Sequence, residues 1–223
     1  MSAKTLVLLP GFMLDDALWD DLVPYLPQDW QVQRIALPRG RDVREVAQGV
    51  AAEIAGPSVV LGFSMGGYVA RALAAAYPQR VEALALVATS SRDERPASWP
   101  AGSADLATFA GLSRRAIQKS LGREHADDAA LIARVHAMSV RLGADAFAWQ
   151  SALDRTGVAL DGISSPTLVV AAREDRLRSI DESRELAEAI DGARLQILEG
   201  TGHLIPLEAP RALAQALIDW LGR

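Results

Sequence analysis

The stretch VVLGFSMGGYVA, residues 59–70, includes the pattern Gly-x-Ser-x-Gly centred on Ser64. It follows an apolar run at Ser58–Leu61 that predicts a buried strand, and it opens a stretch at Met65–Tyr77 that predicts a helix. A serine on a sharp strand-to-helix turn needs small residues two positions before and after it, because larger side chains would collide. Such a turn exposes the Ser64 hydroxyl at the carboxyl edge of the sheet, which makes Ser64 a candidate nucleophile. The alternative is a glycine-rich turn without chemistry.

Five other short runs have the length of strands and are apolar at consecutive positions. This pattern is typical of strands that helices cover on both faces. The runs are Thr5–Leu9, Gln31–Leu37, Ala83–Val87, Thr167–Ala171 and Leu195–Leu198.

Amphipathic stretches with helix start and stop signals separate these runs. Asp42 is a candidate N-cap of a helix that ends near Ala55. Ser179 and Glu182 form a capping-box pattern, and Pro210 suits the first turn of a final helix. The alternation of strand and helix predicts an α/β protein with a doubly wound, mainly parallel sheet of about six strands.

The alternation is interrupted once, between Ser90 and about Ile163. The apolar pattern there predicts helices only, at Ser113–Leu121, Asp127–Leu142 and Ala144–Arg155. Because such a segment cannot join the sheet, we expect it to pack over one end of the sheet as a helical cap. The predicted organisation is an α/β core at residues 1–90 and 163–223 with a cap insertion at 91–162.

Composition excludes several classes of protein. Half of the 223 residues are apolar, the formal net charge is −5 and no basic stripe is present, so we expect a globular chain without a nucleic-acid partner. The longest apolar run, Ala83–Ala88, is far shorter than the roughly 20 residues of a membrane helix, and Leu6–Leu9 is too short for an export signal. We expect a cytoplasmic protein with no membrane partner. The absence of cysteine excludes disulfides, thiolate nucleophiles and cysteine-bound zinc. The sequence does not indicate an oligomeric state.

A nucleophilic serine needs a base, and the chain has three histidines. His203 follows the last predicted strand, and so lies at the carboxyl edge of the sheet, where ligands bind in doubly wound folds. His125 lies in a charged segment and His136 beside the apolar face of a predicted helix. We therefore interpret His203 as the base, His125 as a solvated loop residue and His136 as a packing or surface residue.

The base in turn needs a carboxylate that orients it. Asp175 comes just after the predicted strand Thr167–Ala171 and so emerges at the same edge. Its neighbour Glu174 and the more distant Asp93 are the alternatives. The chain order Ser64, Asp175, His203 is that of enzymes with a nucleophile at a strand-to-helix turn.

Backbone N–H groups are the expected donors of an oxyanion hole. One is that of Met65, next after the candidate nucleophile. The other is that of Phe12, in the loop that follows the first strand, where Gly11 permits a close approach of the backbone. A simple turn at Pro10-Gly11 is the alternative.

Three stretches together resemble the α/β-hydrolase fold superfamily. They are VVLGFSMGGYVA at 59–70, SPTLVVAAREDRL at 165–177 and LEGTGHLIPLEAP at 198–210, in the order of the superfamily's nucleophile, acid and histidine regions. Within the superfamily the chain resembles compact bacterial hydrolases with helical caps, which are grouped with carboxylesterases and lactonases. The resemblance implies a sheet that lacks the first two strands of larger members, and a serine-hydrolase mechanism without metal or organic cofactor.

These observations predict hydrolysis of a small-molecule carboxylic ester or lactone. Ser64 would attack the acyl carbonyl, His203 would take its proton, and Asp175 would orient the imidazole. The alternatives are a lyase, an acyltransferase or a hydrolase of carbon–carbon bonds that uses the same triad, and a non-catalytic ligand-binding protein. Large side chains of the predicted cap are candidates for the substrate pocket or for packing among its helices: Trp99, Phe109, Phe147 and Trp149.

Overall fold

A computed structural model describes residues 4–94 and 108–222. Its strands form one six-stranded sheet with the order β2-β1-β3-β4-β5-β6, and every pair of neighbours is parallel. The α/β fold class with a doubly wound sheet is therefore confirmed. The strands are β1 (Thr5–Leu9), β2 (Gln31–Arg34), β3 (Ser58–Phe63), β4 (Val81–Val87), β5 (Thr167–Ala172) and β6 (Arg194–Leu198).

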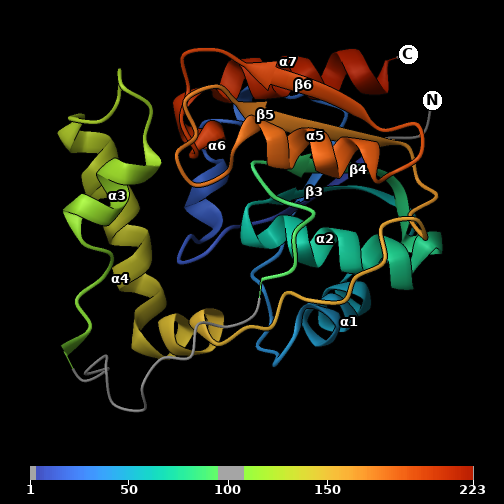
Figure 1. The fold of residues 1–223 in the computed structure, drawn as a ribbon, viewed down its shortest axis with the longest axis horizontal. Helices are drawn as coiled ribbons and strands as arrows, with labels where there is room; N and C mark the ends of the chain where they lie inside the picture. Colours follow the sequence, from blue (N-terminus) through green and yellow to red (C-terminus); the bar gives the residue numbers. More distant parts are fainter. Residues whose placement is uncertain (1–3, 95–107, 223) are drawn as a thin grey trace.

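Helices cover both faces of this sheet (Figure 1). Side chains alternate along a strand, so Val7 and Leu9 of β1 pack on one face while Leu6 and Leu8 pack on the other. The first face is covered by α1 (Val43–Glu53), α2 (Met65–Ala76) and α5 (Ile180–Glu188), and the second by α7 (Pro210–Leu221) with η1 (Asp16–Trp19). The remaining short helices are η2 (Val23–Tyr25), η3 (Pro78–Arg80) and α6 (Ile205–Glu208).

The helix boundaries follow from local capping. Asp42 is the N-cap of α1, and its side chain accepts the N–H groups of Arg44 and Glu45. Ser179 and Glu182 form the predicted capping box at the start of α5, with both reciprocal hydrogen bonds present. Strand ends differ from the sequence prediction at the edge of the sheet, where β2 pairs only with β1 and ends at Arg34.

Two helices lie side by side at one end of the sheet, outside its helical layers: α3 (Arg114–Ser120) and α4 (Ala129–Ser151) (Figure 1). Two helices were predicted here, on either side of Gly143, and this prediction is confirmed. The span labelled α4 is interrupted at Gly143, whose φ of +75° and ψ of −176° are not helical, and it ends at Ser151, before the predicted Arg155. A positive φ suits glycine because it has no Cβ. The position of α3 and α4 agrees with a cap, and the boundaries at 91 and 162 stay a prediction.

Candidate active site

Ser64 lies at the turn from β3 to α2 and has a strained backbone, with φ 51° and ψ −113°. Two neighbours hold it in this conformation. Its N–H donates to the carbonyl of Val87 at 2.9 Å, and the Thr89 hydroxyl donates to its carbonyl at 2.9 Å. The end of β4, the neighbour of β3 in the sheet, and the loop that follows it therefore fix the turn that exposes the Ser64 hydroxyl.

Two glycines make room for this turn. A Cβ on Gly62 would lie 2.4 Å from the carbonyl oxygen of Gly66, and a Cβ on Gly66 would lie 2.3 Å from the carbonyl oxygen of Leu9. The close approach at Gly66 brings the start of α2 against the end of β1. The glycines of the Gly-x-Ser-x-Gly pattern are thus required by packing on both sides of Ser64.

The structure brings Ser64, His203 and Asp175 together. The His203 Nε2 atom is 2.9 Å from the Ser64 Oγ atom, and its Nδ1 atom is 2.7 Å from the Asp175 Oδ2 atom. The side chains of His203 and Asp175 are 7% and 1% exposed. Because a carboxylate can only accept, Nδ1 carries the imidazole proton, and Nε2 is left to accept the proton of the serine hydroxyl.

The loop after β5 aims Asp175 at the imidazole. The Oδ1 atom of Asp175 accepts the N–H groups of Leu177 at 2.7 Å and Arg178 at 2.9 Å, which leaves Oδ2 for His203. The two alternative acids have other partners. Glu174 accepts the N–H of Arg123, and Asp93 accepts the N–H of Gly157.

The other two histidines lie away from this hydrogen-bonded chain. His125 is partly buried in the turn that precedes α4. His136 is exposed on α4, and its Nδ1 atom lies 2.9 Å from the carbonyl oxygen of Leu112. Neither contacts Ser64.

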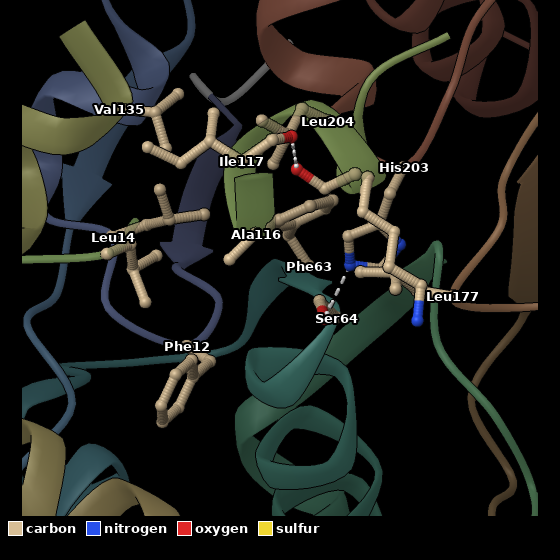
Figure 2. A pocket seen from close by; sticks show the side chains of 13 residues that line it. Phe12, Leu14, Phe63, Ser64, Ala116, Ile117, Val135, Leu177, His203 and Leu204 are labelled. Carbon is tan, nitrogen blue, oxygen red and sulfur yellow. Dashed lines mark hydrogen bonds between the residues drawn. The ribbon is translucent and has the colours of Figure 1, made fainter. Parts of the chain in front are cut away.

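A pocket of about 280 Å³ opens over Ser64 and His203, and Figure 2 shows their hydrogen bond at its floor. Its walls come from the loop after β1, from α3 and α4, and from the loops that carry the acid and the histidine. Among the residues that line it, only Lys119 is a permanently charged side chain, and most of the others are apolar. The lining residues are Phe12, Leu14, Phe63, Ser64, Leu112, Ala116, Ile117, Lys119, Ser120, Val135, Leu177, His203 and Leu204.

Three of the four large side chains expected at the pocket lie in the described part of the chain, and they are not among the residues that line this cavity. Phe147 packs edge-on against Phe12 with ring centroids 5.7 Å apart, and Phe109 lies 4.8 Å from Phe147. Trp149 is partly buried and packs against the core on the face of the sheet that α1 and α2 cover. Trp99 lies outside the described residues. A role of these residues in binding substrate stays a prediction.

Most of the residues that line the pocket are not among the predicted site residues. Leu14, Leu177 and Leu204 each lie within two residues of a predicted site residue or loop, and this proximity is the signal that could have found them. Ile117 and Val135 carried no such signal, since the same apolar spacing also describes a helix that packs only on its neighbours.

The two segments that carry the predicted oxyanion donors lie close to Ser64. Met65 is the first residue of α2, so its N–H is one of those that a helix leaves without an internal partner. A Cβ on Gly11 would lie 3.3 Å from the Cβ of Ser64, so the loop that carries Phe12 passes close to the serine. The next N–H along, that of Met13, donates to the Gln150 side chain at 2.7 Å.

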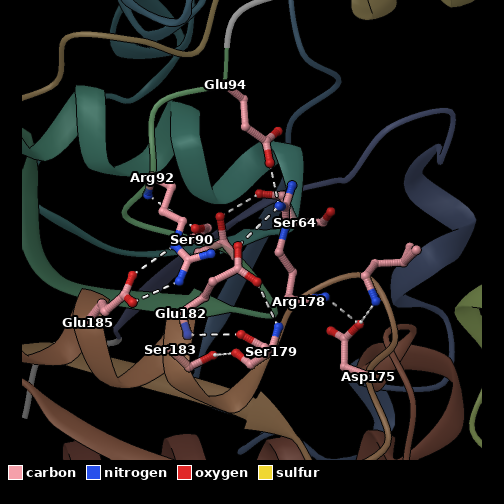
Figure 3. A network of polar contacts seen from close by, with 12 residues as sticks. Ser64, Ser90, Arg92, Glu94, Asp175, Arg178, Ser179, Glu182, Ser183 and Glu185 are labelled. Carbon is pink, nitrogen blue, oxygen red and sulfur yellow. Dashed lines mark hydrogen bonds and ion pairs between the residues drawn. The ribbon is translucent and has the colours of Figure 1, made fainter.

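A partly buried cluster of charged side chains adjoins the acid loop at Arg178 (Figure 3). The carboxylate of Glu94 pairs with Arg178 and, at 3.0 Å, with Arg155. Burial by itself raises the pKa of Glu94, but the two guanidinium groups outweigh it and hold the pKa below its ordinary value of 4.5. No local pattern in the sequence indicates this cluster, because its members come from distant segments.

Two residues of α2, Tyr68 and Arg71, extend the cluster, and the Arg178 guanidinium lies 5.7 Å from the centre of the Tyr68 ring. The Arg71 guanidinium lies 4.3 Å from the centre of the Tyr68 ring and donates to the carbonyl of Ser90 at 2.8 Å. Burial raises the pKa of Tyr68 to about 12 and lowers that of Arg71.

Within residues 4–94 and 108–222, no group of His, Cys, Asp or Glu side chains is arranged to hold a metal ion, and no helix has the length and hydropathy to span a membrane.

The sheet has six parallel strands, and Ser64 lies at a strand-to-helix turn within hydrogen-bond distance of His203. Together these features define an α/β-hydrolase. Residues 6–216 match the sequence profile of the alpha/beta hydrolase family, and the chain belongs to this family. It is a carboxylic ester hydrolase of the α/β-hydrolase fold.

Comparisons with individual proteins agree with this assignment. The pimeloyl-[acyl-carrier protein] methyl ester esterase of Neisseria meningitidis serogroup B is 31% identical over 242 residues, which cover 99% of this chain and 93% of that protein. Its counterpart from Aromatoleum aromaticum is 29% identical and covers 98% of each chain. The enol-lactonase from Burkholderia xenovorans LB400 superposes with a TM-score of 0.86 at 24% identity over 100% of this chain and 93% of that one, which shows a shared fold.

Proposed function

We propose that the chain hydrolyses a carboxylic ester through an acyl-enzyme on Ser64, with His203 as the base and Asp175 as the group that orients it. The observation that carries the proposal is the hydrogen-bonded chain from Ser64 Oγ through His203 to Asp175 at the floor of an apolar pocket. A serine hydroxyl becomes a useful nucleophile only when a base within hydrogen-bond reach removes its proton.

The reaction follows from this geometry in two stages. The Ser64 oxygen bonds to the acyl carbon while its proton passes to Nε2 of His203, and the carbonyl oxygen becomes an anion that the N–H groups of Met65 and Phe12 stabilise. The bond to the alcohol oxygen then breaks, and His203 returns the proton to the departing alcohol. Water, activated by the same imidazole, releases the acid from Ser64.

The pocket and the relatives support a proposal for the substrate class. A volume of about 280 Å³ lies just below the roughly 300–1,000 Å³ that is usual for ligand pockets, and the apolar lining suits an apolar acyl chain. Two relatives that cover nearly the whole chain are named as esterases of a pimeloyl-[acyl-carrier protein] methyl ester. We infer that this chain removes a methyl group from the ester end of a medium-length acyl chain that a carrier protein holds by its other end.

The test compares the wild-type protein with Ser64→Ala on two kinds of ester. On p-nitrophenyl esters from acetate to dodecanoate, we expect the substitution to lower turnover on the order of 10⁴–10⁶-fold. On the methyl ester of pimeloyl-acyl carrier protein, mass spectrometry should show a loss of the methyl group with the wild type only. Residual turnover within tenfold of wild type would overturn the role of Ser64. Cleavage of p-nitrophenyl esters without demethylation would overturn the carrier-bound substrate alone.

A further inference from the structure

Glu208, at the end of α6, binds three backbone N–H groups with one carboxylate. Its Oε2 atom accepts those of Gly122 at 2.7 Å and Gly202 at 3.2 Å, and its Oε1 atom accepts that of Leu204 at 3.0 Å. Gly202 and Leu204 are the residues on either side of His203. Gly122 belongs to the segment that follows α3. A single side chain therefore joins the histidine loop to the connection between α3 and α4.

The bonds to Glu208 and one further backbone bond hold the histidine loop in place. The N–H of His203 itself donates to the carbonyl of Ser120 at 2.8 Å, so three successive backbone N–H groups of the loop have fixed acceptors. The two segments approach closely, since a Cβ on Gly202 would lie 2.2 Å from the nitrogen of Gly122. A loop held at consecutive residues keeps the imidazole at a fixed distance from Ser64.

The charge of Glu208 is costly at this position. Burial raises the pKa of Glu208 above its ordinary value, while the three N–H groups and the nearby His125 act to lower it. A neutral glutamine would be less costly to bury, but it has only one acceptor oxygen. Whichever way its amide were turned, at least one of the three N–H groups would face an NH₂ group in place of an oxygen. The arrangement requires a carboxylate.

We propose that Glu208 is a positioning residue for His203. By holding the histidine loop, Glu208 sets the distance and direction of the imidazole relative to Ser64. Its bond to Gly122 also links this loop to the end of α3, which forms one wall of the pocket. This inference rests on the proposed function, because it assigns Glu208 a role only if His203 is the base. Glu208 acts through the backbone of the histidine loop and does not contact the substrate.

The test is the substitution Glu208→Gln, with steady-state kinetics on a p-nitrophenyl ester. We expect kcat to fall roughly 10- to 100-fold, because a displacement of about 1 Å in a catalytic group costs on the order of 10²-fold. KM should stay within about threefold, because the side chain does not line the pocket. The rate at which a fluorophosphonate labels Ser64 should fall in parallel with kcat, since that reaction also needs the base.

The matched control is Asp128→Ala. Asp128 caps α4 and accepts the N–H of Leu131 at 3.0 Å, so this substitution removes a carboxylate-to-backbone bond from the same connection without touching the histidine loop. We expect it to lower the melting temperature, because it removes a helix cap, and to leave kcat unchanged. Proton NMR gives a second readout, because the downfield Nδ1 proton of His203 should shift or broaden in Glu208→Gln and not in Asp128→Ala.

The outcomes separate this inference from the proposed function. Wild-type kcat in folded Glu208→Gln, or an equal loss of kcat in Asp128→Ala, would overturn the positioning role while the function stands. Wild-type activity that survives Ser64→Ala would overturn the function itself. If Glu208→Gln does not fold, Glu208→Asp keeps the charge but withdraws the carboxylate by one methylene, and the same fall in kcat at constant KM is expected with a smaller size.

Discussion

The side-chain oxygen of Gln150 accepts the backbone N–H of Met13 at 2.7 Å, although 137 residues separate them. Gln150 is 4% exposed and lies near the end of α4, whereas Met13 belongs to the loop after β1. Phe12 immediately precedes Met13, and its N–H is the proposed donor to the oxyanion. The end of α4 is thus bonded to the loop that would stabilise the transition state.

Removal of this bond should affect both stability and turnover. In Gln150→Leu the buried N–H of Met13 loses its acceptor, which costs about 1–3 kcal/mol. Because the loop is then free to shift, we also expect kcat for ester hydrolysis to fall. Chemical denaturation and steady-state kinetics measure the two effects. Gln215→Leu, which removes only an exposed bond to Asp219 on α7, should change neither, and unchanged kcat in Gln150→Leu would contradict a link between α4 and the loop.

A second prediction concerns Gly66, at the start of α2. A methyl group there would lie 2.3 Å from the carbonyl oxygen of Leu9 and 2.5 Å from that of Pro10, and both are backbone atoms that cannot move aside cheaply. Gly66→Ala should therefore lower the free energy of unfolding by more than about 3 kcal/mol. Gly56→Ala is the matched control, because nothing lies within 4 Å of its added methyl group. Thermal unfolding compares them, and equal melting temperatures would refute the steric argument.

The third prediction is a pH dependence of stability through Glu94. In the unfolded chain the pKa of Glu94 is close to the ordinary value of 4.5, and in the folded protein it lies below that value. The ionised form of Glu94 therefore stabilises the folded state. This contribution is complete above pH 4.5 and is lost as the pH falls through the folded pKa. We expect Glu94→Gln to be less stable than wild type by about 1–3 kcal/mol at pH 7, with a difference that shrinks below pH 4.5. Urea titrations at several pH values measure it, and a constant difference would argue against the ion pairs.

Local signals explain why so much of the fold was predictable. The capping box of Ser179 and Glu182 and the N-cap Asp42 satisfy helix ends within a few residues, so the pattern and its cause lie in the same short segment. The chain order of strands and loops also placed Asp175 and His203 at one edge of the sheet. The break at Gly143, between the two helices predicted on either side of it, is a local signal of the same kind.

Contacts between distant segments could not be predicted in this way. Glu208 binds Gly122 across 86 residues, and its role depends on a close approach of two loops that no spacing in the sequence indicates. Glu94 likewise joins Arg155 and Arg178, which are ordinary surface charges when read along the chain. The pocket lining was missed for a related reason: aromatic residues were favoured, whereas smaller side chains such as Ile117 reach the cavity.

The acyl pocket gives the last prediction, through the small residue Ala116 on α3. Ala116 lines the cavity over Ser64, so Ala116→Phe should fill part of it and lower kcat/KM for long-chain esters by roughly 10-fold or more, with little effect on acetate. Ala133→Phe on α4 is the control, because Ala133 lines a second hollow between α3 and α4 and does not line the cavity over Ser64. We expect this variant to leave the chain-length profile unchanged. A series of p-nitrophenyl esters measures both profiles. If both variants lose long-chain activity equally, the cause is a general disturbance of α3 and α4, and the cavity over Ser64 is not what holds the acyl chain.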